Sequence, residues 1–210
     1  MLTKPKILIS RAANSDGKRY ADAILSAGGE PFLAYAYQGK EHFDALLLAG
    51  GGDLDPAYYG EKNCGSYPPD ALRDQAEMAL CDHFVKEKKP ILAICRGCQL
   101  LCVYFGGSLI QHLPTAQNHD GGVSAHHTVV NQQGSLAHTL FGKECAVTTS
   151  HHQAVKTLGK GLVLTQYAKA DGVIEGFAHT TLPIIATQWH PEQMPSTRPL
   201  FEAFVALCHK

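Results

Sequence analysis

The chain lacks the features of a nucleic-acid-binding, membrane-spanning or exported protein. Its formal net charge is −1 at pH 7, so no broad electrostatic field attracts nucleic acid or a membrane surface. No apolar run approaches the roughly 18 residues that a membrane-spanning helix needs. The first ten residues, MLTKPKILIS, lack the long apolar region and cleavage site of a signal peptide. These absences predict a cytoplasmic protein without nucleic-acid or membrane partners.

The cysteines lack the spacing of a disulfide framework. There are 7, at positions 64, 81, 95, 98, 102, 145 and 208. An odd, scattered set in a chain without an export signal favours reduced thiols. Otherwise the composition is ordinary, since 45% of the 210 residues are hydrophobic and 18% are charged. We expect one domain, residues 1–210, with a substantial core.

The hydrophobic pattern predicts strands that alternate with helices in the first half of the chain. Apolar runs indicate strands at 5–11, 30–36, 43–51 and 90–94, and helical spacing indicates helices at 17–30, 69–89 and 97–107. Further strands are predicted at 127–131, 145–150, 162–170, 172–179 and 183–190, and a last helix at 198–210. This order predicts an α/β fold of three layers, in which helices cover both faces of a central, mostly parallel sheet.

Two of these helices have apolar stripes from which we predict a buried face. In the segment 69–89, Leu72, Ala76, Leu80 and Phe84 recur at every fourth position. In the segment 17–30, helical spacing brings together a second set, Tyr20, Ile24 and Leu25.

Cys95 stands where the predicted strand 90–94 breaks into a helix. A strand–cysteine–helix turn presents the side chain at the carboxyl edge of the sheet, and Gly97 permits the tight backbone that such an elbow needs. The helix N-terminus stabilises a thiolate there, and the backbone N–H of Arg96 points to where an oxyanion would form. Cys95 is therefore the predicted nucleophile.

Other interpretations of the cysteine-rich stretch stay open at this point. Cys95 and Cys98 form a C-x-x-C, a pattern that binds zinc or performs dithiol redox chemistry. Zinc would need further ligands, which the histidine-rich segment 119–127 or residues 151–152 could supply. Cys98 and Cys102 lie four residues apart on the predicted helix, and we expect them to be small buried apolar residues.

A base for the nucleophile is available in TQWHPE (187–192), at the end of the last predicted strand. His190 and Glu192 are two positions apart, so an extended backbone would put them on one side. Pro191 favours extension at His190. Glu192 could then orient the imidazole while the other ring nitrogen faces Cys95.

A second donor for the oxyanion is expected from the loop LLLAGGGDLDP (46–56). Its consecutive glycines, Gly50–Gly52, directly follow a predicted strand, so an N–H can face the site without an intervening side chain. The loop lacks the strand–helix context of a dinucleotide-binding G-x-G-x-x-G, which argues against nucleotide binding.

Together, GGGDLDP, ICRGCQLL…GGSLIQHL and QWHPE resemble the class I glutamine amidotransferase superfamily, which has a flavodoxin-like fold. Within it, the chain is most similar to the branch of γ-glutamyl-γ-aminobutyrate hydrolases and γ-glutamyl hydrolases, the peptidase C26 type. The segments that carry this likeness are GGGDLDPAYYGE (50–61), RDQAEMAL (73–80), ICRGCQ (94–99), FGGSLIQHL (105–113), SHHQAVKTLGKGL (150–162) and DGVIEGF (171–177).

The resemblance implies a role for individual residues of this chain. It implies a catalytic triad of Cys95, His190 and Glu192, and an oxyanion hole from Gly51 or Gly52 with Arg96. Gln99 matches a position that contacts the glutamyl group. The remaining implied substrate contacts are His151, His152 and Gln153.

The activity implied by the resemblance is hydrolysis of a γ-glutamyl amide, such as γ-glutamyl-γ-aminobutyrate, through a thioester on Cys95. This chemistry requires no metal and no organic cofactor, and its partner is a small γ-glutamyl molecule. Two alternatives stay open: a glutaminase subunit that supplies ammonia to a partner synthetase, and a non-catalytic γ-glutamyl-binding module. Formation of a homodimer also stays open.

Several residues have less specific interpretations. Arg73 and Asp74 match the branch, and we expect either a place at the pocket rim or a solvated pair. Trp189 is expected to pack in the core beside His190. The histidines 119, 126 and 127 are expected at the lip of the pocket. The branch usually has methionine and asparagine where Cys98 and Cys102 stand. This chain is also short near 113–128 and 179–183, regions that border the pocket in the family. These differences leave the identity of the substrate undetermined.

Overall fold

The computed structural model describes residues 3–120 and 126–209. In chain order the elements are β1 (Lys6–Ser10), α1 (Lys18–Ser26), β2 (Glu30–Ala34), β3 (Ala45–Leu48), α2 (Ala71–Lys86), β4 (Ile91–Ile94), α3 (Arg96–Tyr104), β5 (Ser108–Ile110), β6 (His126–Asn131), α4 (Leu136–Phe141), β7 (Glu144–Thr148), β8 (Ala154–Thr157), β9 (Leu162–Ala168), β10 (Ile174–His179), β11 (Ile184–Thr187) and α5 (Arg198–Leu207). Short 3₁₀ helices include η1 (Pro56–Tyr59), η2 (Ala116–Asn118) and η4 (Pro191–Gln193).

The strands form one mixed sheet in the order β2-β1-β3-β4-β11-β10-β9-β6-β7. The first five strands of this order are parallel, and the following strands pair antiparallel. The two short strands β5 and β8 pair with each other beside β10. The predicted parallel sheet is thus confirmed in its central part, and the strand-rich second half of the chain extends it with antiparallel strands.

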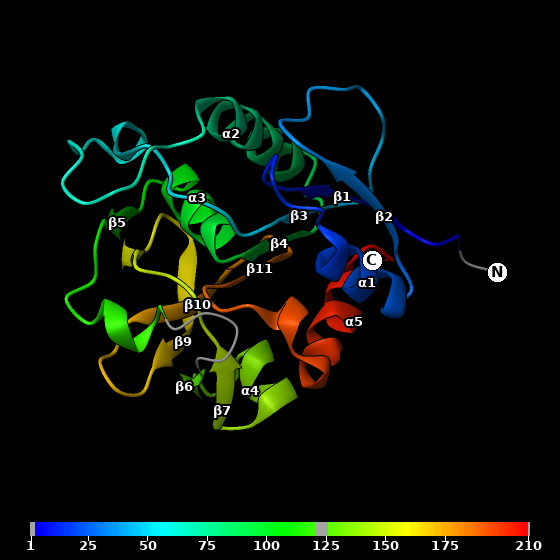
Figure 1. The fold of residues 1–210 in the computed structure, drawn as a ribbon. Coiled ribbons are helices and arrows are strands. Elements are labelled where there is room, and N and C mark those ends of the chain that lie inside the picture. Colours follow the sequence, from blue (N-terminus) through cyan, green and yellow to red (C-terminus); the bar gives the residue numbers. More distant parts are fainter. Residues whose placement is uncertain (1–2, 121–125, 210) are drawn as a thin grey trace.

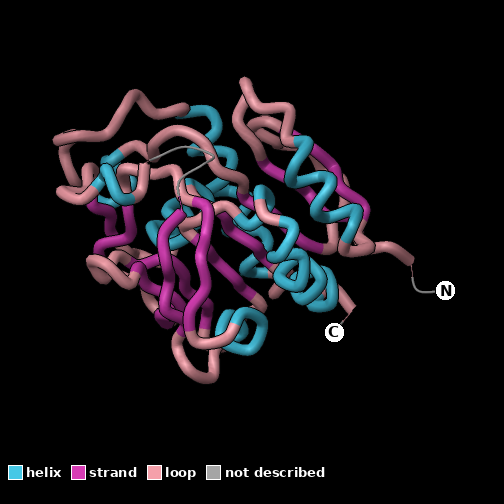
Figure 2. The backbone as a smooth tube through the Cα atoms, turned by 60° about the horizontal axis from the view of Figure 1, so that its bottom comes forward, coloured by secondary structure: helices cyan, strands magenta, loops and turns pink. Residues whose placement is uncertain are grey.

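Helices cover both faces of the parallel part, as Figures 1 and 2 show. Alternate residues of the strands enter two separate cores because successive side chains point to opposite faces. Leu46 and Leu48 of β3 belong to a core beneath α2 and α3, whereas Ala45 and Leu47 belong to one beneath α1 and α5. Three layers result, as the sequence predicts. Within the described ranges, the helices are too short or too polar to cross a bilayer.

The predicted elements agree with the structure except in three short segments and on two helix faces. The strands β5 and β8 and the six-residue helix α4 were not predicted, because runs of three to six residues carry little periodicity. Leu25 is 54% exposed and Leu72 is 62% exposed, so neither belongs to the predicted apolar stripe of its helix. Charged Arg73, Asp74 and Glu77 occupy the buried face of α2 instead.

Candidate active site

Three chain segments meet at the carboxyl edge of the sheet, because β3, β4 and β11 are adjacent parallel strands. Leu48 pairs with Ala93, and Ile94 pairs with Thr187. The glycine loop after β3, Cys95 after β4 and the segment after β11 therefore begin side by side. The predicted site residues come together because of this pairing.

Cys95 forms a sharp elbow between β4 and α3. Its φ of 53° and ψ of −110° lie outside the conformations that ordinary side chains adopt. Its N–H donates to Thr187 O at 2.8 Å, so β11 holds the elbow in place. A Cβ on Gly97 would collide with the Leu48 carbonyl, which explains why glycine is needed where α3 approaches β3.

His190 and Glu192 form a buried pair after β11. His190 Nδ1 lies 2.8 Å from Glu192 Oε1. We expected an extended backbone to bring them together, but this prediction is wrong. Instead, η4 begins at Pro191, and this turn brings the Glu192 carboxylate next to the ring. The His190 N–H donates to Thr148 O at 3.1 Å, which fixes the position of the residue against β7.

The imidazole of His190 lies near Cys95, and Gly50 lies next to both side chains. A Cβ on Gly50 would lie 3.0 Å from His190 Cε1 and 3.5 Å from Cys95 Cβ. Burial alone would lower the pKa of His190, but a hydrogen bond and the negative charges of Cys95 and Glu192 raise that pKa well above its ordinary value. The site therefore favours a protonated imidazole next to the sulfur.

Tyr20 of α1 holds the glycine loop. From the sequence, Tyr20 was predicted only to lie on the apolar face of its helix. The Gly50 N–H donates to the Tyr20 hydroxyl at 3.1 Å. Burial first, and then the negative charges of Glu192 and Cys95, raise the pKa of Tyr20 well above its ordinary value, so the phenol stays neutral. Within the described residues, the next two N–H groups of the loop, on Gly51 and Gly52, have no protein acceptor. Because their donors are uncommitted, they could bind an anion.

A buried ion network links α2, α3 and the glycine loop. Arg96 forms ion pairs with Asp74 and Glu77, and Arg73 Nε lies 2.8 Å from Glu77 Oε1. Arg73 also donates to Ala49 O at 2.9 Å. The expectation of a rim or solvated position for Arg73 and Asp74 is therefore wrong, since both are almost fully buried. Two cations balance two anions here, which reduces the cost of burying each charge.

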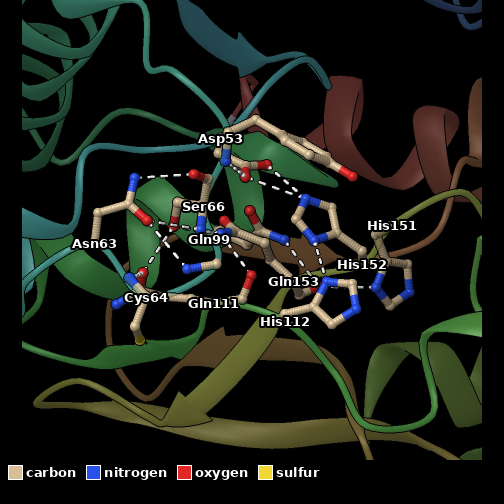
Figure 3. Close-up of polar contacts among 12 residues, drawn as sticks. Asp53, Asn63, Cys64, Ser66, Gln99, Gln111, His112, His151, His152 and Gln153 are labelled. Carbon is tan, nitrogen blue, oxygen red and sulfur yellow. Dashed lines mark hydrogen bonds and ion pairs between the residues drawn. The ribbon is translucent and has the colours of Figure 1, made fainter.

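The expected substrate-contact residues, Gln99, His151, His152 and Gln153, lie close together (Figure 3). Gln99 Nε2 lies 3.2 Å from both Gln153 O and Gln188 Oε1. His152 Nε2 lies 3.1 Å from Asp53 Oδ2, and Gln153 donates to Ser66 Oγ at 2.7 Å. A polar wall results, in which each member is positioned by a neighbour.

His151 differs from its neighbours in orientation. The preceding residue, Ser150, faces Cys95 through its carbonyl, 4.0 Å from Sγ. The His151 ring instead contacts Glu175 of β10, with Nε2 3.5 Å from Oε1. His119 and His127 contact the same carboxylate, so they pack behind this wall. The exposed His126 shares β6 with His127. Positions 121–125 of the histidine-rich segment lie outside the described residues.

The structure argues against the metal interpretation of the cysteine-rich stretch. Cys98 and Cys102 are fully buried in the core beneath α2 and α3, and burial raises the pKa of both thiols. Among residues 3–120 and 126–209, no cysteine belongs to a cluster of metal-ligand type. Cys98 and Cys102 are thus small core residues, as expected. Trp189 is also a fully buried core residue, and its Nε1 donates to Gln166 Oε1 at 3.0 Å.

A cavity of about 540 Å³ borders the site. Its lining includes Gly50, Gly51, His190 and Glu192, together with the segment 14–20. A small molecule can therefore approach the imidazole and the glycine loop from this side.

The chain is similar to known proteins over nearly its whole length. Residues 9–192 match the Peptidase C26 family. A Schizosaccharomyces pombe protein that carries the provisional name glutamine amidotransferase is 36% identical, over 96% of this chain and 85% of its own length. The γ-glutamyl-γ-aminobutyrate hydrolase PuuD of Escherichia coli K12 is 31% identical, over 91% of this chain and 85% of its own length.

A solved structure confirms the fold. The glutamine amidotransferase of Thermotoga maritima superimposes with a TM-score of 0.69 at 16% identity, over 91% of this chain and 77% of that one. The mixed sheet with helices on both faces is therefore the flavodoxin-like fold of the class I glutamine amidotransferases. With the family match and the two relatives, this shows that the chain belongs to the Peptidase C26 family of glutamine amidotransferase-like proteins.

Proposed function

We propose that the chain is a cysteine hydrolase that cleaves γ-glutamyl amide bonds, with Cys95, His190 and Glu192 as its catalytic triad. The observation that carries this proposal is that the strained Cys95 elbow and the imidazole of the buried His190–Glu192 pair both lie next to Gly50, close enough for Cys95 to raise the pKa of His190. Two further observations support it: the uncommitted N–H groups of the glycine loop, and a relative named as a γ-glutamyl-γ-aminobutyrate hydrolase.

In the first half of the reaction, the Cys95 thiolate attacks the γ-carbonyl carbon of the substrate. The carbonyl oxygen becomes an oxyanion, which accepts hydrogen bonds from Gly51 or Gly52 and from the Arg96 N–H at the start of α3. The C–N bond then breaks as the His190 imidazolium donates its proton to the leaving amine. A γ-glutamyl thioester on Cys95 remains.

In the second half, His190 acts as a base. It takes a proton from water, the hydroxide attacks the thioester carbonyl, and the C–S bond breaks to release glutamate and the Cys95 thiolate. Glu192 holds the imidazole through Nδ1 and stabilises its charged form. The cavity beside His190 accommodates the leaving amine, because that amine must be within reach of the proton on the ring.

The polar wall of Gln99, His152 and Gln153 is suited to the amino-acid end of the substrate. A glutamyl group carries a positive α-amino group and a negative α-carboxylate, and each needs polar partners once water is displaced. The Asp53 carboxylate beside His152 supplies a negative charge, and Gln153 Oε1 has no partner among the described residues. We assign this wall to the glutamyl end and the cavity to the amine end.

The test is a panel of γ-glutamyl amides and glutamine incubated with wild-type protein, Cys95→Ala and Cys64→Ser, with product detection by mass spectrometry. Cys64 is an exposed cysteine and serves as the matched control. We expect amine and glutamate from the wild type and from Cys64→Ser, and no turnover with Cys95→Ala. Undiminished turnover by Cys95→Ala would disprove the proposal.

Two other outcomes identify the alternatives. Ammonia release from glutamine, without cleavage of γ-glutamyl-amines, would indicate a glutaminase subunit. Absence of turnover, together with failure of a glutamine-like electrophile to form a covalent adduct on Cys95, would indicate a non-catalytic binding module.

A further inference from the structure

Three histidines surround one buried carboxylate, that of Glu175, behind the polar wall formed by Gln99, His152 and Gln153. Glu175 Oε1 lies 3.2 Å from His119 Nδ1, 3.2 Å from His127 Nε2 and 3.5 Å from His151 Nε2. The Glu175 side chain is completely buried, and those of His119 and His151 are nearly so. The four residues come from four places in the chain: the end of η2, β6, the loop before β8, and β10.

Hydrogen bonds on the outer sides of two rings place their lone pairs toward Glu175. His119 Nε2 lies 2.9 Å from Asp171 Oδ2, so this nitrogen carries the proton and Nδ1 is left with a lone pair. His151 Nδ1 donates to Gln153 O at 2.9 Å, which leaves the lone pair on Nε2. In its neutral form, each ring therefore directs an acceptor at a carboxylate, which is itself only an acceptor.

The cluster also lacks the hydrogen bonds that short distances would suggest. Among the described residues, His119 Nδ1, His127 Nε2, His151 Nε2 and both Glu175 oxygens have no hydrogen-bond partner of acceptable geometry. Buried polar atoms in folded proteins are nearly always satisfied, and leaving them unpaired is costly. Something other than a direct hydrogen bond must satisfy this group of converging acceptors.

We propose that this cluster is a structural site for a divalent transition metal of the Zn²⁺ type. The ligands are His119 Nδ1, His127 Nε2 and Glu175, and His151 Nε2 completes the set. The donor atoms of His119, His127 and Glu175 all lie within 4.8 Å of one another; His151 lies outside this group, with its Nε2 3.5 Å from Glu175 Oε1. Ligands bound to Zn²⁺ in a tetrahedron lie about 3.3 Å apart, given bonds of about 2.0 to 2.2 Å. The separations from Glu175 agree with this value.

The outer hydrogen bonds fit the same assignment. Metal-bound histidines usually donate their second N–H to a carboxylate or a backbone carbonyl, which fixes the ring and its tautomer. Asp171 has this position for His119, and Gln153 O has it for His151. With His151 as the fourth protein ligand, no coordination position is left for a substrate, so we assign the metal a structural role.

The metal would connect the antiparallel part of the sheet to the pocket. His127 lies on β6 and Glu175 on β10, whereas His151 directly follows Ser150, whose carbonyl faces the Cys95 sulfur. Metal binding would therefore fix the segment 150–153 against the sheet. This inference does not depend on the proposed hydrolase activity, because its test measures metal binding.

The experiment is titration of the chelator-treated full chain with Co²⁺ and Zn²⁺. We expect one ion per chain and the intense visible absorption of tetrahedral Co²⁺, which Zn²⁺ displaces. His127→Gln should weaken binding by about 100-fold or more, and Asp171→Asn, which keeps all four ligands, by about 10- to 100-fold. His126→Gln is the matched control, because this exposed neighbour shares strand β6 with His127, and it should bind as the wild type does.

The proposal is overturned if the wild-type chain does not bind either ion, or if His127→Gln and the wild type bind equally well. Should His127→Gln fail to fold by circular dichroism, the wild-type Co²⁺ spectrum decides, and a spectrum without tetrahedral bands overturns the assignment. Activity assays are not part of this test, so its failure and that of the hydrolase proposal are distinguishable.

Discussion

Arg96, the residue after Cys95, forms a fully buried ion pair with Glu77 of α2. Glu77 also pairs with Arg73, which donates to Ala49 O just before the glycine loop. Glu77 thus links the helix behind the cysteine elbow to the loop that faces it. The relative position of these two parts depends on one carboxylate that does not itself face the cavity.

Replacing Glu77 with Gln should therefore destabilise the protein strongly. The change leaves two arginines with a single anion, Asp74, and removing one partner of a buried pair costs about 3 to 5 kcal/mol. Chemical denaturation monitored by circular dichroism measures this. Asp82→Asn is the control on the same helix, because Asp82 forms an exposed surface pair with Lys86; the free energy of unfolding of this variant should change by less than about 0.5 kcal/mol. Equal effects of the two substitutions would contradict the network.

The pH dependence of stability should report the pairing of His190 with Cys95. The folded-state pKa of His190 is raised, so its stabilising contribution is complete below the unfolded value of about 6.5 and is lost as pH rises through the higher folded pKa. The contribution of His190 to the free energy of unfolding should thus fall with increasing pH above about 6.5.

Cys95→Ala tests this interpretation, because it removes the sulfur that contributes to raising the pKa. The pKa of the His190 imidazole, read from an NMR titration between about pH 6 and 9, should be lower in Cys95→Ala than in the wild type, whereas Cys64→Ser should match the wild type. Parallel pH profiles for all three proteins would show that the pKa of His190 does not depend on Cys95.

Glu192→Gln should reduce kcat on γ-glutamyl amides by a factor of about 10² to 10⁴, with little change in KM. The amide no longer stabilises the imidazolium or fixes its tautomer, while its nearly identical size preserves the shape of the cavity that Glu192 lines. Glu202→Gln is a suitable control, since Glu202 forms a surface pair with Arg198. A kcat within twofold of the wild type for Glu192→Gln would exclude Glu192 from the triad.

Gly51→Ala and Gly52→Ala should differ although the residues are neighbours. Gly51 has a φ of 157°, and a Cβ there would collide with the Arg73 guanidinium; among the residues that the structure describes, a Cβ on Gly52 meets nothing within 4 Å. We expect Gly51→Ala to lose about 1 to 3 kcal/mol of stability by displacing Arg73. Gly52→Ala should keep the wild-type Tm, so any loss of its activity reports on the loop itself. A similar Tm for both variants would show that the loop adapts.

Local sequence patterns were sufficient for the parts of the site that follow strands. Each strand ends in a distinctive segment: glycines after β3, a cysteine and glycine after β4, and His-Pro-Glu after β11. Parallel strands place their carboxyl ends on one edge of the sheet. The proximity of Cys95 and His190 could therefore be predicted from the sequence alone. The backbone at Glu192 could not, because the 3₁₀ turn there depends on residues around it.

The buried charges were predicted less well for a similar reason. Arg73 and Asp74 have the pattern of a solvated pair in the sequence, since charged residues are normally exposed. They are buried because Arg96 and Glu77 arrive from other positions to neutralise them. Tyr20 likewise looked like a helix-face residue, and only the packing of α1 against the glycine loop brings its hydroxyl to Gly50.

The sequence by itself determined the α/β layering, the cysteine elbow and the order in which the site segments arrive, because these follow from periodicity and from glycine at fixed positions. The tertiary structure alone decided which charges are buried and which histidines meet. His119, His127, His151 and Glu175 are scattered over 57 positions of the chain, and only the antiparallel extension of the sheet brings them together. Contacts of this kind depend on long-range packing, which no local pattern encodes.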